Sequence, residues 1–447
     1  MNEYQYDRKT VSAGIVHFGV GNFHRAHLQY YNNLLLEYGD QRKWGVYGAM
    51  IMPADGTLYN MLKRDDGIYE LTVCYPSGAR NIHRIGSLIG LCWGEENPEP
   101  IIEQIASPNI KIITLTITEG GYILKSNAES ERHKTVFWYV AEGLRRRMAA
   151  DLPITILSCD NLQHNGDTAA KSFFSYFDAM YPDVAVWARE NVTFPNSMVD
   201  RITPATRSGK ITDVYCEDFI QWVVEDKFIA GRPAWERVGV HFTNDVTPYE
   251  NMKLSLLNAS HSLLCYPAYL EGFKKVDVVL ADSRYRTMIK DFMNVDVTPY
   301  VPVPEGVDLD DYKETLLRRF SNTAVSDQVS RLCGDGIAKF AVYIVPTLRK
   351  MLVDGKDTRR LAFLLASYYK YLKYERTESG EKIEIFEPHI TAKDKEILAG
   401  ESTIRFFELS PFAELSLSNY PKFVDQYKYF VEHSVGEGLD LATVLGK

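Results

Sequence analysis

The sequence has little of several features that mark whole classes of protein. Its formal net charge is −9, so it has no basic excess with which to neutralise the phosphates of a nucleic acid. No apolar run approaches the roughly 18 residues that a membrane-spanning helix needs. The first residues also lack the apolar core of a signal peptide. We therefore expect a cytoplasmic protein whose partners include neither nucleic acid nor a membrane.

Cysteine is scarce, and the usual metal-binding motifs are absent from the sequence. The chain has 6 cysteines and 10 histidines among 447 residues, with no C-x-x-C pair and no H-E-x-x-H motif. Those spacings are typical of zinc sites, although a site assembled from distant residues would leave no such motif. We expect reduced, buried thiols and a chemistry that is independent of metal ions.

The composition is that of an ordinary globular protein, with 45% hydrophobic and 24% charged residues. In the first part of the chain, short β-rich runs alternate with helical patterns. The runs are 13–18, 44–50, 112–117 and 154–158, and the helices are 24–37 and 57–64. This alternation predicts an α/β domain with a parallel sheet, whose ligands lie beyond the carboxyl ends of the strands.

Helical patterns dominate from about residue 245 onward. They cover 249–272, 311–321, 324–333, 336–352, 357–374 and 391–400. We place a boundary near residues 243–247 and predict two domains, a dinucleotide-binding domain over 1–244 and a mainly α-helical substrate domain over 245–447.

A glycine-rich turn follows the first strand and leads into the first helix. One glycine makes the tight turn, a second lets the backbone approach a pyrophosphate, and a helix N-terminus favours the anion. The third glycine of the usual fingerprint is replaced by His24. An ordinary strand-to-helix turn is the alternative, and Arg25 either neutralises phosphate or is a solvated helix residue. The candidate cofactor-binding residues here are Gly19, Val20, Gly21, Asn22, Phe23 and Arg25.

Two acidic residues follow other strands of the predicted sheet. Asp55 is the first acid after the second strand, where a carboxylate would bind the ribose of the cofactor, or else cap the next helix. No Arg or Lys follows that strand before Lys63, so NAD is favoured over NADP. Glu119 lies in the segment T-I-T-E-G-G-Y, whose glycines would let the backbone approach the cofactor.

A second group of polar residues lies on one predicted helix. At roughly 100° per residue, Glu250, Lys253, Asn258 and His261 fall within an arc of roughly 140° that also holds leucines. This mixture is typical of a partly buried site. The alternative is a solvated helix face with a Glu–Lys pair.

This set of residues suits the oxidation of an alcohol. Removing hydride from the carbon requires a base for the hydroxyl proton, and a desolvated lysine has a lowered pKa that suits this role. The developing alkoxide needs fixed donors, which Asn258 supplies, together with Asn161 in the segment S-C-D-N after another strand. A polar turn is the alternative for Asn161. His261 could hold a neighbouring hydroxyl.

Together these segments resemble the polyol-specific long-chain dehydrogenases, the mannitol dehydrogenase family. The matching stretches, in family order, are 15–27, 114–122, 158–166, 196–204, 221–240, 246–262 and 331–340. The resemblance implies a Rossmann-type N-terminal domain and a mostly α-helical C-terminal domain, with the site between them. It also implies metal-independent oxidation of sugar alcohols.

The resemblance assigns roles to individual residues. Lys253 resembles the general base of the family, and Glu250 the acid that passes the proton to solvent. Asn161 and Asn258 resemble the pair that stabilises the oxyanion, and His261 resembles a residue that positions the substrate. Arg331, Lys339 and Asp200 are the candidates for binding substrate hydroxyls. Asp200 and Arg201 form a pair of a kind that is more often structural.

The substrate is less clearly defined by the sequence. Members of the family oxidise mannitol or arabinitol, reduce keto-uronates such as fructuronate and tagaturonate, or act on mannitol 1-phosphate. A uronate requires a cation for its carboxylate, which Arg331 could supply, whereas an uncharged polyol suits the sparse basic residues. We predict D-mannitol and D-fructose first, with keto-uronate reduction or arabinitol oxidation as alternatives. A catalytically silent dinucleotide-binding regulator is the alternative from a different class.

Overall fold

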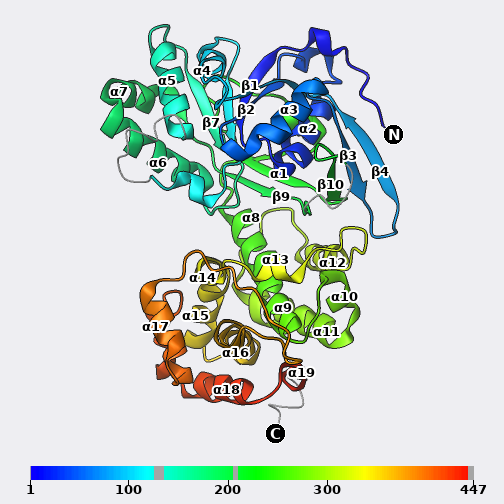
Figure 1. Ribbon diagram of the computed structural model, residues 1–447, viewed down its shortest axis with the longest axis vertical. Helices are drawn as coiled ribbons and strands as arrows, with labels where there is room; N and C mark the ends of the chain where they lie inside the picture. The colour runs from blue at the N-terminus through cyan, green and yellow to red at the C-terminus, as the bar shows by residue number, and fades with distance from the viewer. Residues whose placement is uncertain (1, 125–134, 205–209, 441–447) are drawn as a thin grey trace. The chain divides into compact units, whose positions relative to one another are not determined.

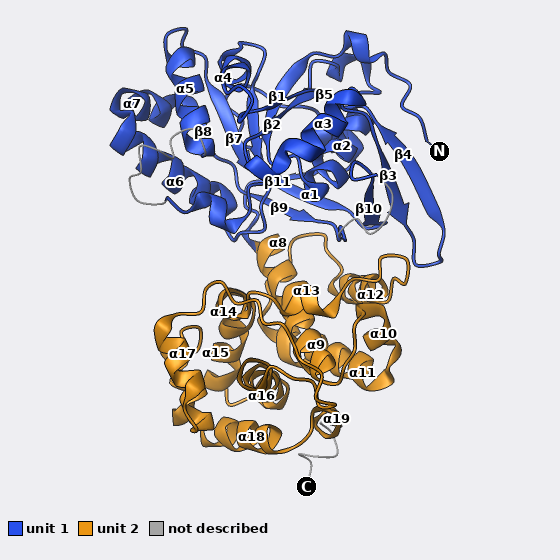
Figure 2. Cartoon of the chain, in the orientation of Figure 1, with its two compact units in different colours: residues 1–247 blue, residues 248–447 orange. Residues whose placement is uncertain are grey.

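The computed structural model describes residues 2–124, 135–204 and 210–440. By its internal contacts, the chain divides into two compact units, unit 1 over Met1–Thr247 and unit 2 over Pro248–Lys447 (Figure 2). Each unit is described by itself.

Unit 1 is built on a 6-stranded parallel sheet (Figure 1). In sheet order its strands are β5 (Leu88–Trp93), β2 (Gly45–Met50), β1 (Ala13–Phe18), β6 (Ile112–Leu115), β7 (Ile154–Ser158) and β8 (Val192–Thr193). The strand order reverses at β1 and β6, which are hydrogen-bonded neighbours. The loops that follow these two strands therefore meet at the edge where sheets of this kind bind ligands.

Helices cover both faces of this sheet, which explains why its strands are continuous apolar runs. The helices of unit 1 are α1 (Asn22–Ala26), α2 (Leu28–Leu35), α3 (Gly56–Arg64), α4 (Glu99–Ala106), α5 (Val136–Met148), α6 (Asn165–Met180) and α7 (Pro182–Asn191). Val16 and Phe18 of β1 pack on one face, against α4, α5, α6 and α7, whereas Ile15 packs on the other, against α2 and α3.

Two 3-stranded sheets complete unit 1. One joins β10 (Val214–Glu217), β3 (Tyr69–Cys74) and β4 (Arg80–Ile85), and the other joins β12 (His241–Thr243), β11 (Gln221–Glu225) and β9 (Ser197–Asp200). Their apolar side chains, such as Leu71 and Trp222, pack in the same core as α2 and α3.

Among its described residues, unit 2 is helical and has one large apolar core. Its helices are α8 (Thr247–Met252), α9 (Ala259–Leu270), α10 (Val276–Ala281), α11 (Ser283–Asp291), α12 (Leu309–Phe320), α13 (Val329–Cys333), α14 (Gly336–Lys339), α15 (Val345–Val353), α16 (Arg359–Tyr374), α17 (Ala392–Ala399), α18 (Pro421–Glu432) and α19 (Val435–Gly438). Segments of π-helix occupy Lys253–Asn258, Phe292–Val297 and Phe340–Ile344.

Two helices differ from their predicted extents. The predicted helix over 24–37 is two helices, because the backbone leaves helical geometry at His27, with φ −110° and ψ −83°. The ring nitrogen Nε2 of His27 lies 2.9 Å from the carbonyl oxygen of Gln221. The helix predicted over 324–333 begins only at Val329. Before it, the side chain of Asn322 accepts hydrogen bonds from the N–H groups of Ala324 and Val325, and this holds a turn instead.

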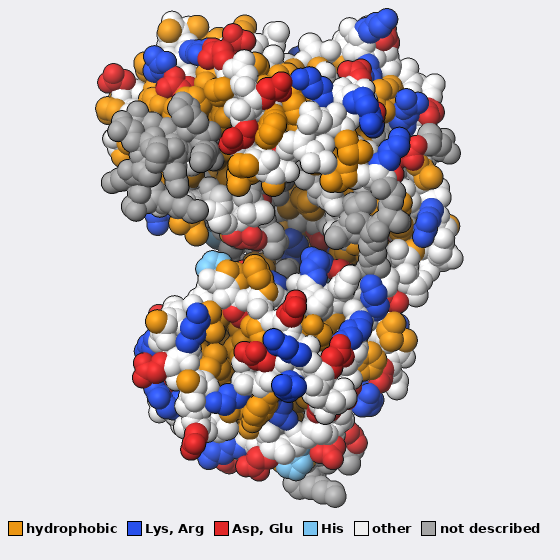
Figure 3. Space-filling view, in the orientation of Figure 1, with side chains coloured by type: hydrophobic (Ala, Val, Ile, Leu, Met, Phe, Trp, Pro, Cys, Tyr) orange, Lys and Arg blue, Asp and Glu red, His pale blue; other side chains and the backbone are white. Residues whose placement is uncertain are grey.

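The predicted fold class is confirmed, since a parallel-sheet α/β unit precedes a helix-rich one. Side chains of both charge signs are interspersed on the visible face of each unit (Figure 3). None of the described helices combines the length and the apolar character required to cross a membrane.

Candidate active site

The turn after β1 has a geometry that requires glycine at its first position. Gly19 has φ +93°, and a Cβ there would lie 2.0 Å from the carbonyl oxygen of Thr116, at the end of β6. The Thr116 hydroxyl donates to the carbonyl of Gly19 at 2.7 Å, which joins the loops after β1 and β6. At Gly21, by contrast, a Cβ would meet no atom closer than 3.9 Å. Gly21 therefore leaves open space beside the backbone, as close approach of a ligand requires.

The rest of the turn is held from inside the protein. Arg25 is buried, and its guanidinium donates to the side chain of Asn22 at 2.7 Å and to the carbonyl of Thr212 at 2.6 Å. Arg25 therefore supports the loop and is not a solvated helix residue. Val20 is buried and Phe23 stacks on His27 with ring centroids 4.9 Å apart. The helix whose N-terminus would favour an anion at this turn is short, because α1 ends at Ala26.

His24, in place of the third glycine, packs against a second histidine that the motif did not reveal. The rings of His17 and His24 are both fully buried and stack with centroids 3.4 Å apart. His17 contacts Thr114 through Nδ1 at 2.8 Å and the carbonyl of Gly19 through Nε2 at 3.1 Å. Burial lowers the pKa of His17 to about 3 and that of His24 well below its ordinary value. Both rings are therefore neutral at ordinary pH and form a packed floor under the loop.

Asp55 and Glu119 lie on loops beyond β2 and β6. Asp55 is half-buried, and its carboxylate accepts a hydrogen bond from the N–H of Met52 at 2.9 Å. It occupies the N-cap position of α3, but its side chain makes no hydrogen bond to that helix. Asp55 therefore stands where a capping residue would stand without forming the capping hydrogen bond. Glu119 is exposed and begins a short 3₁₀ turn over Glu119–Tyr122.

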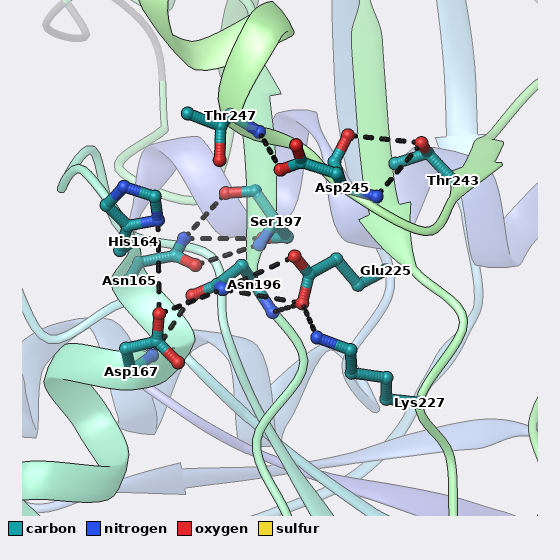
Figure 4. A network of polar contacts seen from close by, with 10 residues as sticks. All are labelled: His164, Asn165, Asp167, Asn196, Ser197, Glu225, Lys227, Thr243, Asp245 and Thr247. Carbon is teal, nitrogen blue, oxygen red and sulfur yellow. Dashed lines mark hydrogen bonds and ion pairs between the residues drawn. The ribbon is translucent and has the colours of Figure 1, made fainter.

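Asn161 lies in the loop between β7 and α6, and its side chain is exposed. The loop is fixed by Asn165, which is fully buried and donates through Nδ2 to the carbonyl of Ser158 at 3.1 Å and to that of Ser197 at 2.8 Å. Figure 4 shows Asn165 beside Ser197. A wider network continues to β11, where Glu225 accepts from Asn196 and from Lys227. The end of β7 is therefore tied to the β9–β11 sheet beside Asn161.

The predicted polar face of unit 2 is not a solvated helix surface. Glu250 is 3% exposed and Lys253 is 8% exposed. A π-helix runs from Lys253 to Asn258. In an α-helix these two residues would point roughly 140° apart, whereas the i→i+5 hydrogen bonds of a π-helix bring residues five apart close to one face. The widened turn thus aligns Lys253 with Asn258.

Asn258 has one end of its amide unsatisfied. Its Oδ1 is buried and has no hydrogen-bond partner among the residues that the structure describes. Buried polar groups are normally hydrogen-bonded, and the two ends of a side-chain amide have nearly the same shape, so the amide can present either its oxygen or its NH₂ group. This side chain is therefore suited to bind a ligand hydroxyl or oxygen.

His261, Asp327 and Arg331 form a group around one buried carboxylate. Asp327 is 7% exposed and accepts a hydrogen bond from Nε of Arg331 at 2.9 Å. Burial raises the pKa of Asp327, but the bond and charge of Arg331 outweigh burial and hold it below its usual value, with His261 adding to the effect. The His261 ring packs on Phe320 with centroids 4.4 Å apart. Sequence reasoning missed Asp327, although its i, i+4 spacing from Arg331 was a usable signal.

Lys339 and Asp200, the two remaining candidates for binding the substrate, lie among other residues of their own units. The Lys339 ammonium donates to the carbonyls of Leu332 at 3.1 Å and Gly334. Asp200 is 5% exposed and ends β9. Its neighbour Arg201 donates to the carbonyl of Ala26 at 2.6 Å, which supports the structural role expected for that arginine. Among the described residues, no cluster of three or more His, Cys, Asp or Glu is arranged to hold a metal ion.

The sheet order, the glycine turn and the buried lysine are features of a dinucleotide-dependent dehydrogenase, and comparison with known proteins identifies the family. Residues 13–237 match the mannitol dehydrogenase Rossmann domain, and residues 245–434 match the mannitol dehydrogenase C-terminal domain. The chain belongs to the mannitol dehydrogenase family, and the predicted resemblance is confirmed.

Individual relatives match nearly the whole chain. A polyol:NADP oxidoreductase of Gluconobacter oxydans is 37% identical, over 91% of this chain and 90% of that protein. A mannitol 2-dehydrogenase of Phaeosphaeria nodorum is 36% identical, over 97% of this chain and 81% of that protein. The Pseudomonas fluorescens mannitol 2-dehydrogenase, solved as a ternary complex with NAD and D-mannitol, has a TM-score of 0.88 at 35% identity, over 98% of this chain and 96% of that one.

Proposed function

We propose that this protein oxidises a secondary alcohol of a sugar alcohol to the ketose with NAD, and that D-mannitol and D-fructose are its preferred pair. The observation that carries the proposal is the nearly complete burial of Lys253 on a π-helical turn that aligns it with Asn258. The similarity to a mannitol 2-dehydrogenase that binds NAD and D-mannitol supports the same conclusion.

The turn after β1 fits a dinucleotide. The open space beside Gly21 and the fixed, left-handed conformation that Gly19 adopts without strain suit close approach of a pyrophosphate. Asp55 would accept hydrogen bonds from the adenosine ribose, and Glu119 lies on the neighbouring loop. When bound, the nicotinamide accepts hydride from the alcohol carbon.

The residues of the chain supply the remaining chemistry in this proposal. Lys253 takes the proton of the reacting hydroxyl as general base, and Glu250, three residues before it, passes that proton toward solvent. Asn258 and Asn161 donate hydrogen bonds to the oxygen on which negative charge develops. His261 holds an adjacent hydroxyl.

The charges around Arg331 favour an uncharged polyol over a keto-uronate. A carboxylate substrate is best bound by a cation whose charge is not already paired, but the charge of Arg331 is paired with that of the buried Asp327. Lys339 keeps its charge, and its ammonium already donates to two backbone carbonyls. Both can still donate to hydroxyl groups, and Asp200 can accept from one.

The proposal is tested by measuring NADH absorbance with the purified protein. The substrates are D-mannitol, D-sorbitol and D-arabinitol with NAD or NADP, and D-fructose, fructuronate and tagaturonate with the reduced cofactors. We expect the highest kcat/KM for D-mannitol with NAD. The NADP arms are needed because the Gluconobacter relative is named for NADP. Preferred turnover of a keto-uronate would replace the substrate assignment, and NAD binding without turnover of any substrate would favour the silent regulator.

A further inference from the structure

Asp160 lies between the loops that follow β6 and β7, and nothing in the sequence motifs gave it a role. Its side chain is 7% exposed. The carboxylate accepts hydrogen bonds from the N–H of Ile117 at 3.0 Å, the N–H of Thr118 at 2.9 Å and the hydroxyl of Tyr122 at 2.6 Å. All of these donors belong to the segment after β6. One buried side chain at the end of β7 therefore fixes the neighbouring loop.

The loop that Asp160 holds contains a residue in a strained backbone conformation. Thr118 has φ +62°, in the left-handed region that side chains other than glycine rarely adopt. It immediately precedes the 3₁₀ turn of Glu119–Tyr122. Tyr122 is bound a second time, by the hydroxyl of Ser158 at 2.7 Å. The position of Glu119 is thus set by contacts on both sides of it.

The backbone of Asp160 is fixed from the other direction. Its carbonyl accepts a hydrogen bond from Nδ2 of Asn165 at 3.1 Å, and the same Nδ2 reaches Ser197 at 2.8 Å. Asn161, the proposed oxyanion donor, is the next residue in the chain. Asp160 therefore joins the loop with Glu119, through its side chain, to Asn161, through its backbone.

We propose that Asp160 is a positioning residue, whose carboxylate holds the loop carrying Glu119 in register with Asn161 without itself touching the substrate. This inference rests on the proposed function. Replacement by Asn cannot reproduce the arrangement, because both carboxylate oxygens accept from a backbone N–H. Whichever way the carboxamide turns, its NH₂ group faces one of those N–H donors.

The ionisation of Asp160 gives the role a pH signature. Burial raises the pKa of Asp160 to about 6, although the bonds from Tyr122, Ile117 and Thr118 favour the anion, and the charge of Glu119 raises it further. Burial lowers the pKa of His17, the buried histidine of β1, to about 3, so this ring stays neutral in this range. As the pH falls through about 6, protonation places a hydrogen against donors. The affinity for NAD is then expected to fall.

Protonation of Asp160 has the opposite effect on folding stability from its expected effect on NAD affinity. Because the pKa of Asp160 is raised from 3.8 to about 6, the native state binds the proton more tightly than the unfolded chain does. The group's contribution to stability is therefore greatest below about 4 and decreases as the pH rises toward 6. A loss of NAD affinity on acidification is thus not a loss of folding caused by Asp160.

The matched control is Asp394 of unit 2. It is 1% exposed and accepts from the N–H groups of Thr391 at 3.0 Å and Ser410 at 2.8 Å, as well as from both hydroxyls. Asp394→Asn therefore removes a carboxylate that is also buried and also joins two segments, outside the motifs of the proposed site.

The experiment measures equilibrium binding of NAD, without substrate, together with Tm from pH 5 to 9. We expect Asp160→Asn to weaken NAD binding at least tenfold at pH 7.5 and to abolish the loss of affinity near pH 6, whereas Asp394→Asn leaves both as in the wild type. Tyr122→Phe removes one donor to the anion, so it should move the acid limb to higher pH; this variant decides the matter if Asp160→Asn does not fold.

Unchanged affinity and pH profile in Asp160→Asn, or an unmoved limb in Tyr122→Phe, would overturn the inference. The inference would also be overturned if Asp394→Asn weakened NAD binding as much as Asp160→Asn does, with the two variants having equal Tm. Binding is read separately from turnover, so a wild type that binds NAD with an acid limb but oxidises no polyol would overturn only the proposed function.

Discussion

The two glycines of the turn after β1 should respond to the same substitution in opposite ways. Gly19→Ala places a Cβ 2.0 Å from the carbonyl oxygen of Thr116 at φ +93°. The left-handed backbone alone costs about 1–2 kcal/mol for an alanine, and the contact adds to this cost. For a domain of roughly 150–250 residues, each kcal/mol lowers Tm by about 2–4 °C. We expect a decrease of several degrees, with weaker NAD binding as a consequence.

Gly21→Ala should leave the fold intact. Gly21 has φ −85° and ψ −173°, which alanine adopts without strain, and the new Cβ would meet no protein atom closer than 3.9 Å. Stability should therefore stay equal or rise by about 0.4–1 kcal/mol through the unfolded state. If a pyrophosphate lies against this backbone, the methyl group occupies its space. We expect NAD affinity to fall at least tenfold, equivalent to about 1.4 kcal/mol.

The assay combines differential scanning fluorimetry with NAD titration of both variants and the wild type. The expected pattern is a lowered Tm for Gly19→Ala, and an unchanged Tm with weak NAD binding for Gly21→Ala. Normal NAD affinity in Gly21→Ala would refute the assignment of this turn to the cofactor, because the substitution has no other steric consequence.

Three further predictions concern the other proposed site residues. Lys253→Ala should lower turnover at least about 10²-fold with NAD affinity nearly kept; near-normal turnover between pH 6 and 10 would exclude Lys253 as the base. Asp55→Ala should weaken the binding of NAD and reduce the preference for NAD over NADP, because the carboxylate of Asp55 repels a 2′-phosphate. Equal use of both cofactors by the wild type would contradict this role. Asn161→Ala and Asn258→Ala should each raise the barrier by about 2.7–4 kcal/mol if they resemble known oxyanion donors. Their combined effect should be less than additive if they act as one unit, and strict additivity in a double-mutant cycle would argue against the pairing.

Local patterns were most informative where burial and propensity favour the same structure. The strands at Ala13–Phe18 and Ile154–Ser158 were predicted to the residue, because a parallel strand covered on both faces is a continuous apolar run bounded by polar turns. The helix over 24–37 was not, because the backbone leaves helical geometry at His27, whose ring contacts Gln221, far along the chain. The turn before Val329 depends on one Asn side chain that competes with the helix.

The site divides in the same way. The motif residues, their order and the family follow from the sequence, since a glycine turn, a lysine–asparagine–histidine spacing and short apolar strands are local patterns. The π-helical turn, the burial of Lys253 and the supports around Asp160 do not. Asp160 binds Ile117 and Thr118, 43 and 42 residues away, and His17 contacts Thr114, 97 residues away. Periodicity carries no information about such partners, because only the pairing of β1 with β6 and of β6 with β7 brings those loops together.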